Sequence, residues 1–136
     1  MKIVVKDEVK EIEVKDELPT IYEVLYGQSL SQIGLDIYKS PTYWPLIFSA
    51  NSSKIKDPDK IFLSSKLTIP AKSEGKVLHD SYLDVYDAYM SVDKMSRSFW
   101  ILCEGANYIG EDFQRFLMKK LHPMEYKIIQ RCLKSK

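Results

Sequence analysis

Residues 22–70 read YEVLYGQSLSQIGLDIYKSPTYWPLIFSANSSKIKDPDKIFLSSKLTIP, a stretch in which turn residues and apolar residues follow one another in a regular order. Its first part predicts a mostly buried strand over residues 21–26, which Gly27 ends. Ser29 is a candidate N-cap for the next helix, because its hydroxyl can accept a hydrogen bond from a backbone N–H of the first turn. In that helix, apolar residues recur at helical spacing: Leu30, Ile33, Ile37 and Tyr38.

A second helix is predicted directly after the first. Ser40 is expected to cap it and Pro41 to take its first position, where a backbone N–H is not needed. Its inner face is formed by Tyr43, Trp44, Ile47 and Phe48, and Asn51 ends it. Although aromatic rings stack on sugars, this position predicts that Trp44 belongs to the core. A last strand is expected around residues 66–69, ended by Pro70, which gives the order strand–helix–helix–strand.

Residues 20–71 resemble a LysM domain, a small β-α-α-β module best known for binding N-acetylglucosamine chains. The resemblance depends on Gly27-Gln28-Ser29-Leu30, Trp44-Pro45, Asn51, Pro58-Asp59 and Ile69-Pro70 standing in the family's order. In that family the glycan lies between the loop after the first strand and the loop before the last strand. The resemblance therefore implies a shallow glycan-binding groove made by two loops.

Carried over to this chain, the glycan-binding residues implied by the resemblance are Gly27, Gln28, Ser29, Leu30, Asp57, Pro58, Asp59 and Ile61. Leu30 and Ile61 would form an apolar floor for an acetyl methyl group, and Ser29 or loop amides would supply polar contacts. The chain departs from the family's usual residues at Gln28, at Lys39 and at Leu63-Ser64-Ser65. An alternative therefore stays open, in which the two loops merely close the domain.

The remaining segments complete an α+β prediction. Residues 1–19 are expected to form a short N-terminal β-hairpin, residues 20–71 the LysM-like module and residues 72–80 a polar linker. Residues 81–136 are expected to form a three-helix extension: one long helix over 81–106, a short helix from Glu111 and a final helix from Pro123. Tyr82, Tyr86 and Tyr89 share a face of the long helix, which suits either a core or an interface.

Composition limits the function classes. The formal net charge of +1 argues against a broad nucleic-acid-binding surface, so no nucleic-acid partner is predicted. No apolar run reaches the roughly 20 residues that span a bilayer, so no membrane insertion is predicted. The charged N-terminus does not resemble a signal peptide, so the chain as written is expected in the cytoplasm; export or assembly by another route would place it at the cell wall or in a virion.

Catalysis is not expected. Cys103 and Cys132 lie in apolar helical patterns, where a cysteine is most often a small hydrophobic residue. His79 and His122 stand in unrelated contexts, and the common metal and phosphate motifs do not occur. No catalytic residue, cofactor or metal site is therefore predicted, and the chain is predicted not to be an enzyme.

Two functions follow from the sequence. In the first, the module recognises a GlcNAc-containing glycan such as peptidoglycan. In the second, the LysM fold serves protein–protein docking as an adaptor, for example in a phage tail baseplate or another contractile machine. The apolar positions of the 81–136 helices also make an oligomer through these helices possible.

Overall fold

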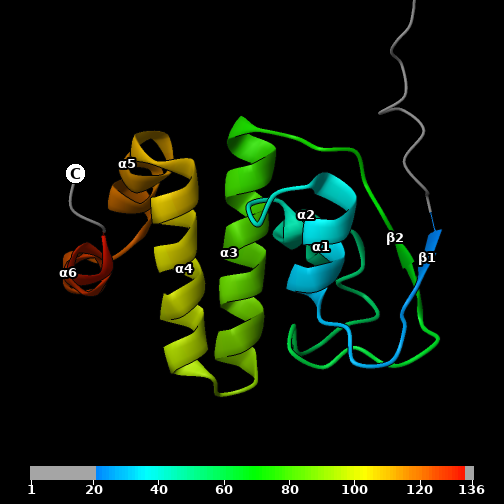
Figure 1. The fold of residues 1–136 in the computed structure, drawn as a ribbon. Helices are drawn as coiled ribbons and strands as arrows, with labels where there is room; N and C mark the ends of the chain where they lie inside the picture. Colours follow the sequence, from blue (N-terminus) through cyan, green and yellow to red (C-terminus); the bar gives the residue numbers. More distant parts are fainter. Residues whose placement is uncertain (1–20, 134–136) are drawn as a thin grey trace, which may run out of the picture.

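The structure is a computed structural model and describes residues 21–133. These residues form an α+β fold with six helices and one two-stranded sheet (Figure 1). The elements are β1 (Ile21–Glu23), α1 (Leu30–Tyr38), α2 (Trp44–Ala50), β2 (Lys66–Thr68), α3 (Gly75–Ser91), α4 (Met95–Ile109), α5 (Glu111–Lys120) and α6 (Pro123–Cys132). The predicted strand–helix–helix–strand order is present over residues 21–68. The predicted hairpin of residues 1–19 lies outside the described residues.

The sheet is antiparallel and short. Tyr22 pairs with Leu67 in its centre, and the Leu67 side chain is buried beneath the helices. The side chain of Asn51 joins α2 to β2: its Nδ2 donates to the carbonyl oxygen of Ile47 at 2.7 Å and to that of Thr68 at 2.9 Å. Its Oδ1 accepts from the Thr68 N–H at 2.9 Å. Asn51 therefore ends α2, as predicted, and also attaches the helix pair to the sheet.

The two module helices approach each other closely at Gly34. A Cβ built on Gly34 would lie 2.5 Å from the Trp44 Cβ and 2.9 Å from the Trp44 Cα, so no larger residue fits without moving α2. Trp44 is 5% exposed, which confirms the prediction that it belongs to the core. α2 begins at Trp44, so the prediction that Pro41 opens it was wrong. Ser40 instead accepts from the Thr42 N–H in a tight turn, and Pro45 is the proline of the first helical turn.

The helical extension differs from its prediction in two respects. Instead of one long helix there are two, α3 and α4, which turn back on each other at Val92–Lys94. Asp93 adopts a left-handed conformation with φ of 62°, and the Lys94 N–H donates to the Tyr89 carbonyl at 2.8 Å. Residues 75–80, expected in the linker, form the start of α3. The apolar stripe continues across the turn, and no glycine or proline marks it, so spacing alone did not reveal the break.

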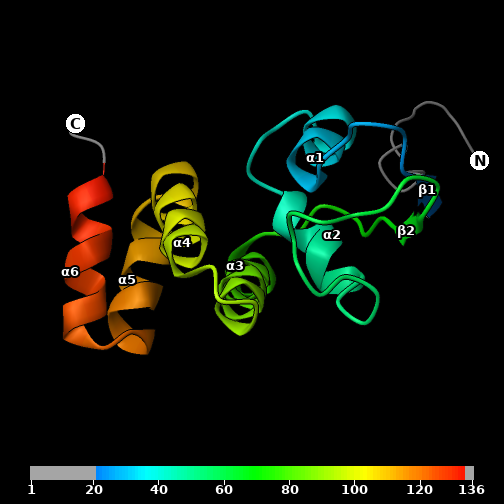
Figure 2. The same cartoon turned by 90° about the horizontal axis from the view of Figure 1, so that it is seen from below.

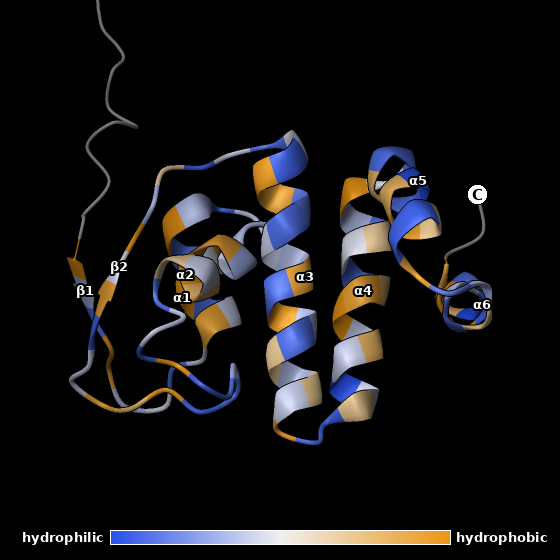
Figure 3. Ribbon diagram, turned by 180° about the vertical axis from the view of Figure 1, so that it is seen from behind, coloured by the Kyte–Doolittle hydropathy of each residue, from blue (hydrophilic) through white to orange (hydrophobic). Residues whose placement is uncertain are grey.

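The elements are arranged side by side. Figures 1 and 2 show α3 between the module and α4, with α5 and α6 on the far side of α4. Tyr82, Val85 and Tyr89 of α3 are fully buried, and the Tyr82 hydroxyl donates to the Thr42 carbonyl of the module at 2.6 Å. Apolar and hydrophilic segments alternate along α3 and α4 (Figure 3), as expected for amphipathic helices that cover one another. The module and extension therefore share one core.

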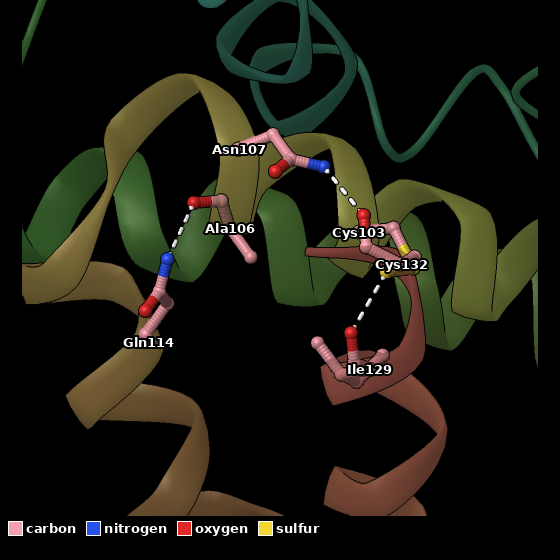
Figure 4. Close-up of a disulfide and its surroundings, with 6 residues drawn as sticks. All are labelled: Cys103, Ala106, Asn107, Gln114, Ile129 and Cys132. Atoms are coloured by element: carbon pink, nitrogen blue, oxygen red, sulfur yellow. Dashed lines mark hydrogen bonds between the residues drawn. A yellow bond between two sulfur atoms is a disulfide. The ribbon is translucent and has the colours of Figure 1, made fainter. Parts of the chain in front are cut away.

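A disulfide between Cys103 and Cys132 joins α4 to α6, with their Cα atoms 5.9 Å apart (Figure 4). The sequence-based interpretation of both cysteines as small hydrophobic residues was therefore wrong. Close by, the Asn107 side chain donates to the Cys132 carbonyl at 3.1 Å. The starts of α5 at Glu111 and of α6 at Pro123 agree with the predictions from charge and capping.

Candidate functional site

The first loop of the predicted groove is held by its own side chains. Gly27 has φ of 81°, a conformation that glycine adopts without strain. Gln28 closes the turn, because its Oε1 accepts from the Leu25 N–H at 2.9 Å and its Nε2 donates to the Tyr22 hydroxyl at 2.8 Å. Ser29 caps α1, as predicted, in a capping box with Gln32. The side chains of Gln28 and Ser29 therefore already have partners in β1, in the loop and in α1.

The second loop is also built on local hydrogen bonds. The Asp57 carboxylate accepts from the Asp59 N–H at 2.9 Å, and the Lys60 N–H donates to the Asp57 carbonyl at 2.9 Å. This arrangement is a turn of the kind that aspartate favours, since its short side chain can bond to the backbone two residues further on. The Asp57 side chain is 10% exposed, whereas that of Asp59 is 30% exposed. The Asp59 carboxylate is therefore the more accessible of the two.

Residues from the α3–α4 hairpin bind both aspartates. Tyr89 donates its hydroxyl proton to Asp59 Oδ1 at 2.6 Å. Arg97 donates from Nη2 to Oδ1 at 2.8 Å and from Nε to Oδ2 at 3.1 Å, a two-point pair that fixes the carboxylate plane. Lys94 pairs with Asp57 at 2.8 Å and reaches Asp59 at 3.4 Å. We call these five residues (Asp57, Asp59, Tyr89, Lys94 and Arg97) the loop–hairpin cluster.

The electrostatics of the loop–hairpin cluster favour the ionised carboxylate. Burial opposes ionisation of Asp59, but the hydrogen bonds from Arg97 and Tyr89 outweigh it, so the pKa of Asp59 lies below its usual value. Burial, followed by the hydrogen bond to Asp59, raises the pKa of Tyr89. Arg97 also lies over the Trp100 ring at 4.0 Å and over the Tyr89 ring at 5.2 Å. The loop–hairpin cluster thus combines ion pairs with the aromatic rings of Tyr89 and Trp100.

The hairpin leaves little space between the two loops. Of the eight predicted glycan-binding residues, Leu30, Asp57 and Pro58 are buried. The cavity lined by Ser29, Leu30, Pro58 and Asp59 on one side and by Tyr89, Arg97 and Trp100 on the other has a volume of about 50 Å³. Pockets for small molecules usually measure about 300–1,000 Å³. Gly27 and Gln28 do not line this cavity, and Ile61 lines a different one.

Sequence reasoning missed Tyr89, Lys94 and Arg97 as members of the site. The three residues were assigned to one continuous helix, whose face toward the module was not predicted. A local signal does exist, since Asp93, Lys94 and Arg97 place three charged residues within five positions of an amphipathic stretch. That signal indicates a polar contact but not its partner, which lies 38 positions before Arg97.

A second hollow lies beside the first, between α1 and α4. It has a volume of about 270 Å³ and shares Ser31, Trp44 and Trp100 with the small cavity. Its polar wall includes Gln32 and Glu104. The Trp44 and Trp100 rings are stacked with centroids 6.4 Å apart, so with Arg97 on Trp100 these rings offer edges rather than free faces.

Neither loop carries the motif of a known enzyme class. No protein-family model, curated protein or solved structure matches the chain. The resemblance to LysM domains therefore depends on the residues quoted above.

Other chemistry-bearing residues lie apart from this site. His79 is buried against the rings of Phe113 and Phe116, with its ring centroid 5.2 and 5.0 Å from theirs, and burial lowers its pKa. His122 caps α6. Within residues 21–133, no three histidine, cysteine, aspartate or glutamate side chains are grouped to hold a metal ion. The same residues include no helix long and apolar enough to cross a membrane.

Proposed function

We propose that this protein is a non-catalytic docking scaffold, in which a LysM-like module and a helical hairpin act as one protein-binding unit. The observation that supports this most directly is the pair between Asp59 and Arg97. In this pair, a side chain from α4 binds a loop residue that the family resemblance assigns to glycan. A loop that contacts the chain's own helix has a structural task, which fits the interpretation that the loops close the domain.

The size of the remaining space also favours docking over glycan recognition in the loops. A cavity of about 50 Å³ is several times smaller than the volume usual for a small-molecule site. To admit a sugar ring, Tyr89 and Arg97 would have to leave Asp59 and expose a carboxylate already ordered by three hydrogen bonds. Losing these bonds would subtract from any binding free energy.

Glycan recognition remains the second candidate, and one observation favours it. The hollow between α1 and α4 combines indole edges with Gln32, Ser31 and Glu104, groups that suit the hydroxyl and acetamido groups of a sugar. Such a glycan would bind beside the two predicted loops and not between them. Ser31 and Trp100 would then be contact residues that the resemblance does not include.

Titration with chitopentaose, followed through backbone amide shifts, tests the proposal. We expect no shifts for residues 27–30 and 57–61 at about 1 mM ligand, where even weak binders are detected, and no retention on purified peptidoglycan. Shifts centred on those residues would overturn the docking proposal and restore glycan binding between the loops. Shifts centred on Ser31, Gln32 and Trp100 would instead support the second candidate.

A further inference from the structure

A pocket beside β2 has no residue of the loop–hairpin cluster in its lining. Its volume is about 190 Å³, and its apolar lining is formed by Ile55, Ile61, Phe62 and Leu67. Ile55 and Leu67 are buried and form the base, whereas Phe62 is 70% exposed and stands as a wall. The pocket thus has room for one hydrocarbon side chain supplied from outside.

Lysine residues surround this apolar pocket. Lys54, Lys60 and Lys66 all line it, and each is exposed. The Lys54 ammonium donates to the Lys66 carbonyl at 3.0 Å, which holds it at the pocket. Among residues 21–133, no carboxylate lies within ion-pair distance of any of the three ammonium groups. This includes the carboxylate of Glu23, although Glu23 is the cross-strand partner of Lys66.

Backbone turns fix the positions of these lysines. The Lys54 N–H donates to the Asn51 carbonyl at 2.9 Å, and the Lys60 N–H donates to the Asp57 carbonyl at 2.9 Å. Before Lys66, the Ser65 N–H donates to the Phe62 carbonyl at 3.0 Å across Ser64, whose φ is 68°. Three separate turns therefore bring three lysines to one pocket, and only the side chains of Lys60 and Lys66 have to be ordered when a ligand binds.

The apolar surface continues past the pocket. The Val24 N–H donates to the Ser65 carbonyl, and the Val24 carbonyl accepts from the Ser64 N–H, both at 2.9 Å. These bonds join the loop after β1 to the turn before β2. On these two segments Leu25 and Leu63 are each 59% exposed and Tyr26 is 90% exposed. Exposed apolar residues gathered at one place, with polar residues around them, are typical of interaction sites.

We infer that this lysine-rimmed pocket binds an acidic segment of a partner protein, with one aliphatic side chain seated among Ile55, Ile61 and Phe62. The inference rests on the proposed docking function and names the chemistry of its partner. Carboxylates of the segment pair with Lys54, Lys60 and Lys66, which have no acidic partner among residues 21–133. The apolar base distinguishes this ligand from a free anion, because an anion alone would leave Ile55 and Phe62 uncovered. The concave shape favours a peptide side chain over a flat lipid surface.

Fluorescence anisotropy with labelled model peptides tests the inference on the full chain. The probe is an alternating Glu–Leu peptide, and the comparison peptides are Glu–Ser and Lys–Leu peptides of equal length. We expect the Glu–Leu peptide to bind with a Kd of roughly 10 μM to 1 mM, more weakly as salt increases. The Glu–Ser peptide should bind more weakly than Glu–Leu, and Lys–Leu not at all.

Two variants with matched controls locate the binding. The double variant Lys60→Glu with Lys66→Gln should weaken the Glu–Leu peptide by about tenfold or more, equivalent to ~1.4 kcal/mol. Phe62→Ser should weaken Glu–Leu but leave Glu–Ser unchanged. The controls Lys119→Glu with Lys127→Gln, and Met118→Ser, change exposed residues of α5 and α6 by the same charge or polarity. They should leave the Kd within about twofold.

Three results would overturn the inference. The first is no binding of the Glu–Leu peptide at about 1 mM, and the second is an equal loss of affinity in the control variants. The third is binding to phosphatidylcholine–phosphatidylglycerol vesicles with amide shifts at Tyr26 and Leu63, when the peptide causes no shifts there. Failure here is separable from failure of the docking function. Chitopentaose shifts centred on residues 27–30 and 57–61 overturn the docking function and restore glycan binding between the loops, whatever the peptides do. A blank peptide titration alone removes this pocket as the partner site.

Discussion

Arg97 of α4 holds the carboxylate of Asp59 at two points, through Nη2 at 2.8 Å and Nε at 3.1 Å. The two residues come from two separately predicted units of the chain, the LysM-like module and the helical extension, whose relative orientation was not predicted. Their contact makes the packing of α4 on the module specific in orientation, because a planar guanidinium donates two hydrogen bonds to a carboxylate in only a few geometries.

A double-mutant cycle on Asp59→Ala and Arg97→Ala should give a coupling energy of about 1–2 kcal/mol in urea unfolding. The value is at the low end for a two-point pair because the side chains are 30% and 41% exposed, so water screens them. The matched control is Lys76 with Asp80, an exposed i,i+4 pair at 2.6 Å on α3. That cycle should give no more than about 0.5 kcal/mol. Equal couplings for both pairs would mean that the Asp59 pair is an ordinary surface contact.

Stability should fall in acid in a way that depends on Asp59. Its pKa in the folded state lies below the ordinary value of 3.8. Such a group contributes stability that is fully present above the unfolded pKa and is lost as pH falls through the folded pKa. Urea midpoints at about pH 6 and about pH 3 should therefore differ less in Asp59→Asn than in the wild type. Asp80→Asn, which alters an exposed ion pair, should keep the wild-type difference; an unchanged difference in Asp59→Asn would contradict the prediction.

Gly34→Ala should destabilise the module by roughly 1–3 kcal/mol. The added methyl group meets the Trp44 Cβ at 2.5 Å, and backbone atoms of Trp44 cannot rotate away. This clash must exceed the gain of about 1 kcal/mol that alanine has over glycine within a helix. Asp36→Ala, an exposed change in α1, serves as the control and should be neutral or slightly stabilising. A Gly34→Ala protein as stable as the wild type would show that α1 and α2 can separate at little cost.

Loss of the Cys103–Cys132 disulfide should lower the free energy of unfolding by roughly 2–4 kcal/mol, since it closes a long loop in the unfolded chain. The two cysteines are 29 positions apart. Thermal unfolding of Cys103→Ala with Cys132→Ala, compared with wild type with and without a reductant, measures the effect. The reductant should bring wild type to the level of the double variant and leave that variant unchanged. If wild type resists the reductant while mass spectrometry shows free thiols, the disulfide contributes nothing to stability.

Local signals predicted much of the fold. Ser29 capped α1, Asn51 ended α2 and Pro123 opened α6, because capping and proline geometry act within a few residues. The charges of Glu111 and Lys120 likewise marked the two ends of α5. Residues of this kind determine where an element begins or ends whatever it later packs against.

The candidate site was less predictable, because its contacts join distant positions. Nothing near Asp59 in the sequence indicates that its partners are Tyr89 and Arg97, 30 and 38 positions later. The turn at Val92–Lys94, which brings them back to the module, uses a left-handed Asp93 in place of glycine or proline. The pairing of Cys103 with Cys132 depends on the same packing of helices, and spacing alone does not determine it.

Asn51 also bears on whether the protein aggregates through the edge of its sheet at high concentration. A two-stranded sheet has open edges, and an open edge can recruit a strand from another molecule and start aggregation. At Thr68 both outward backbone groups are bonded to the Asn51 amide, and the Lys66 carbonyl is bonded to Lys54. A side chain thus takes the place of a neighbouring strand along β2. Replacing Asn51 would therefore do more than weaken the end of α2. It would also leave the N–H and carbonyl of Thr68 unbonded at the edge of β2, where a strand of another molecule could pair with them.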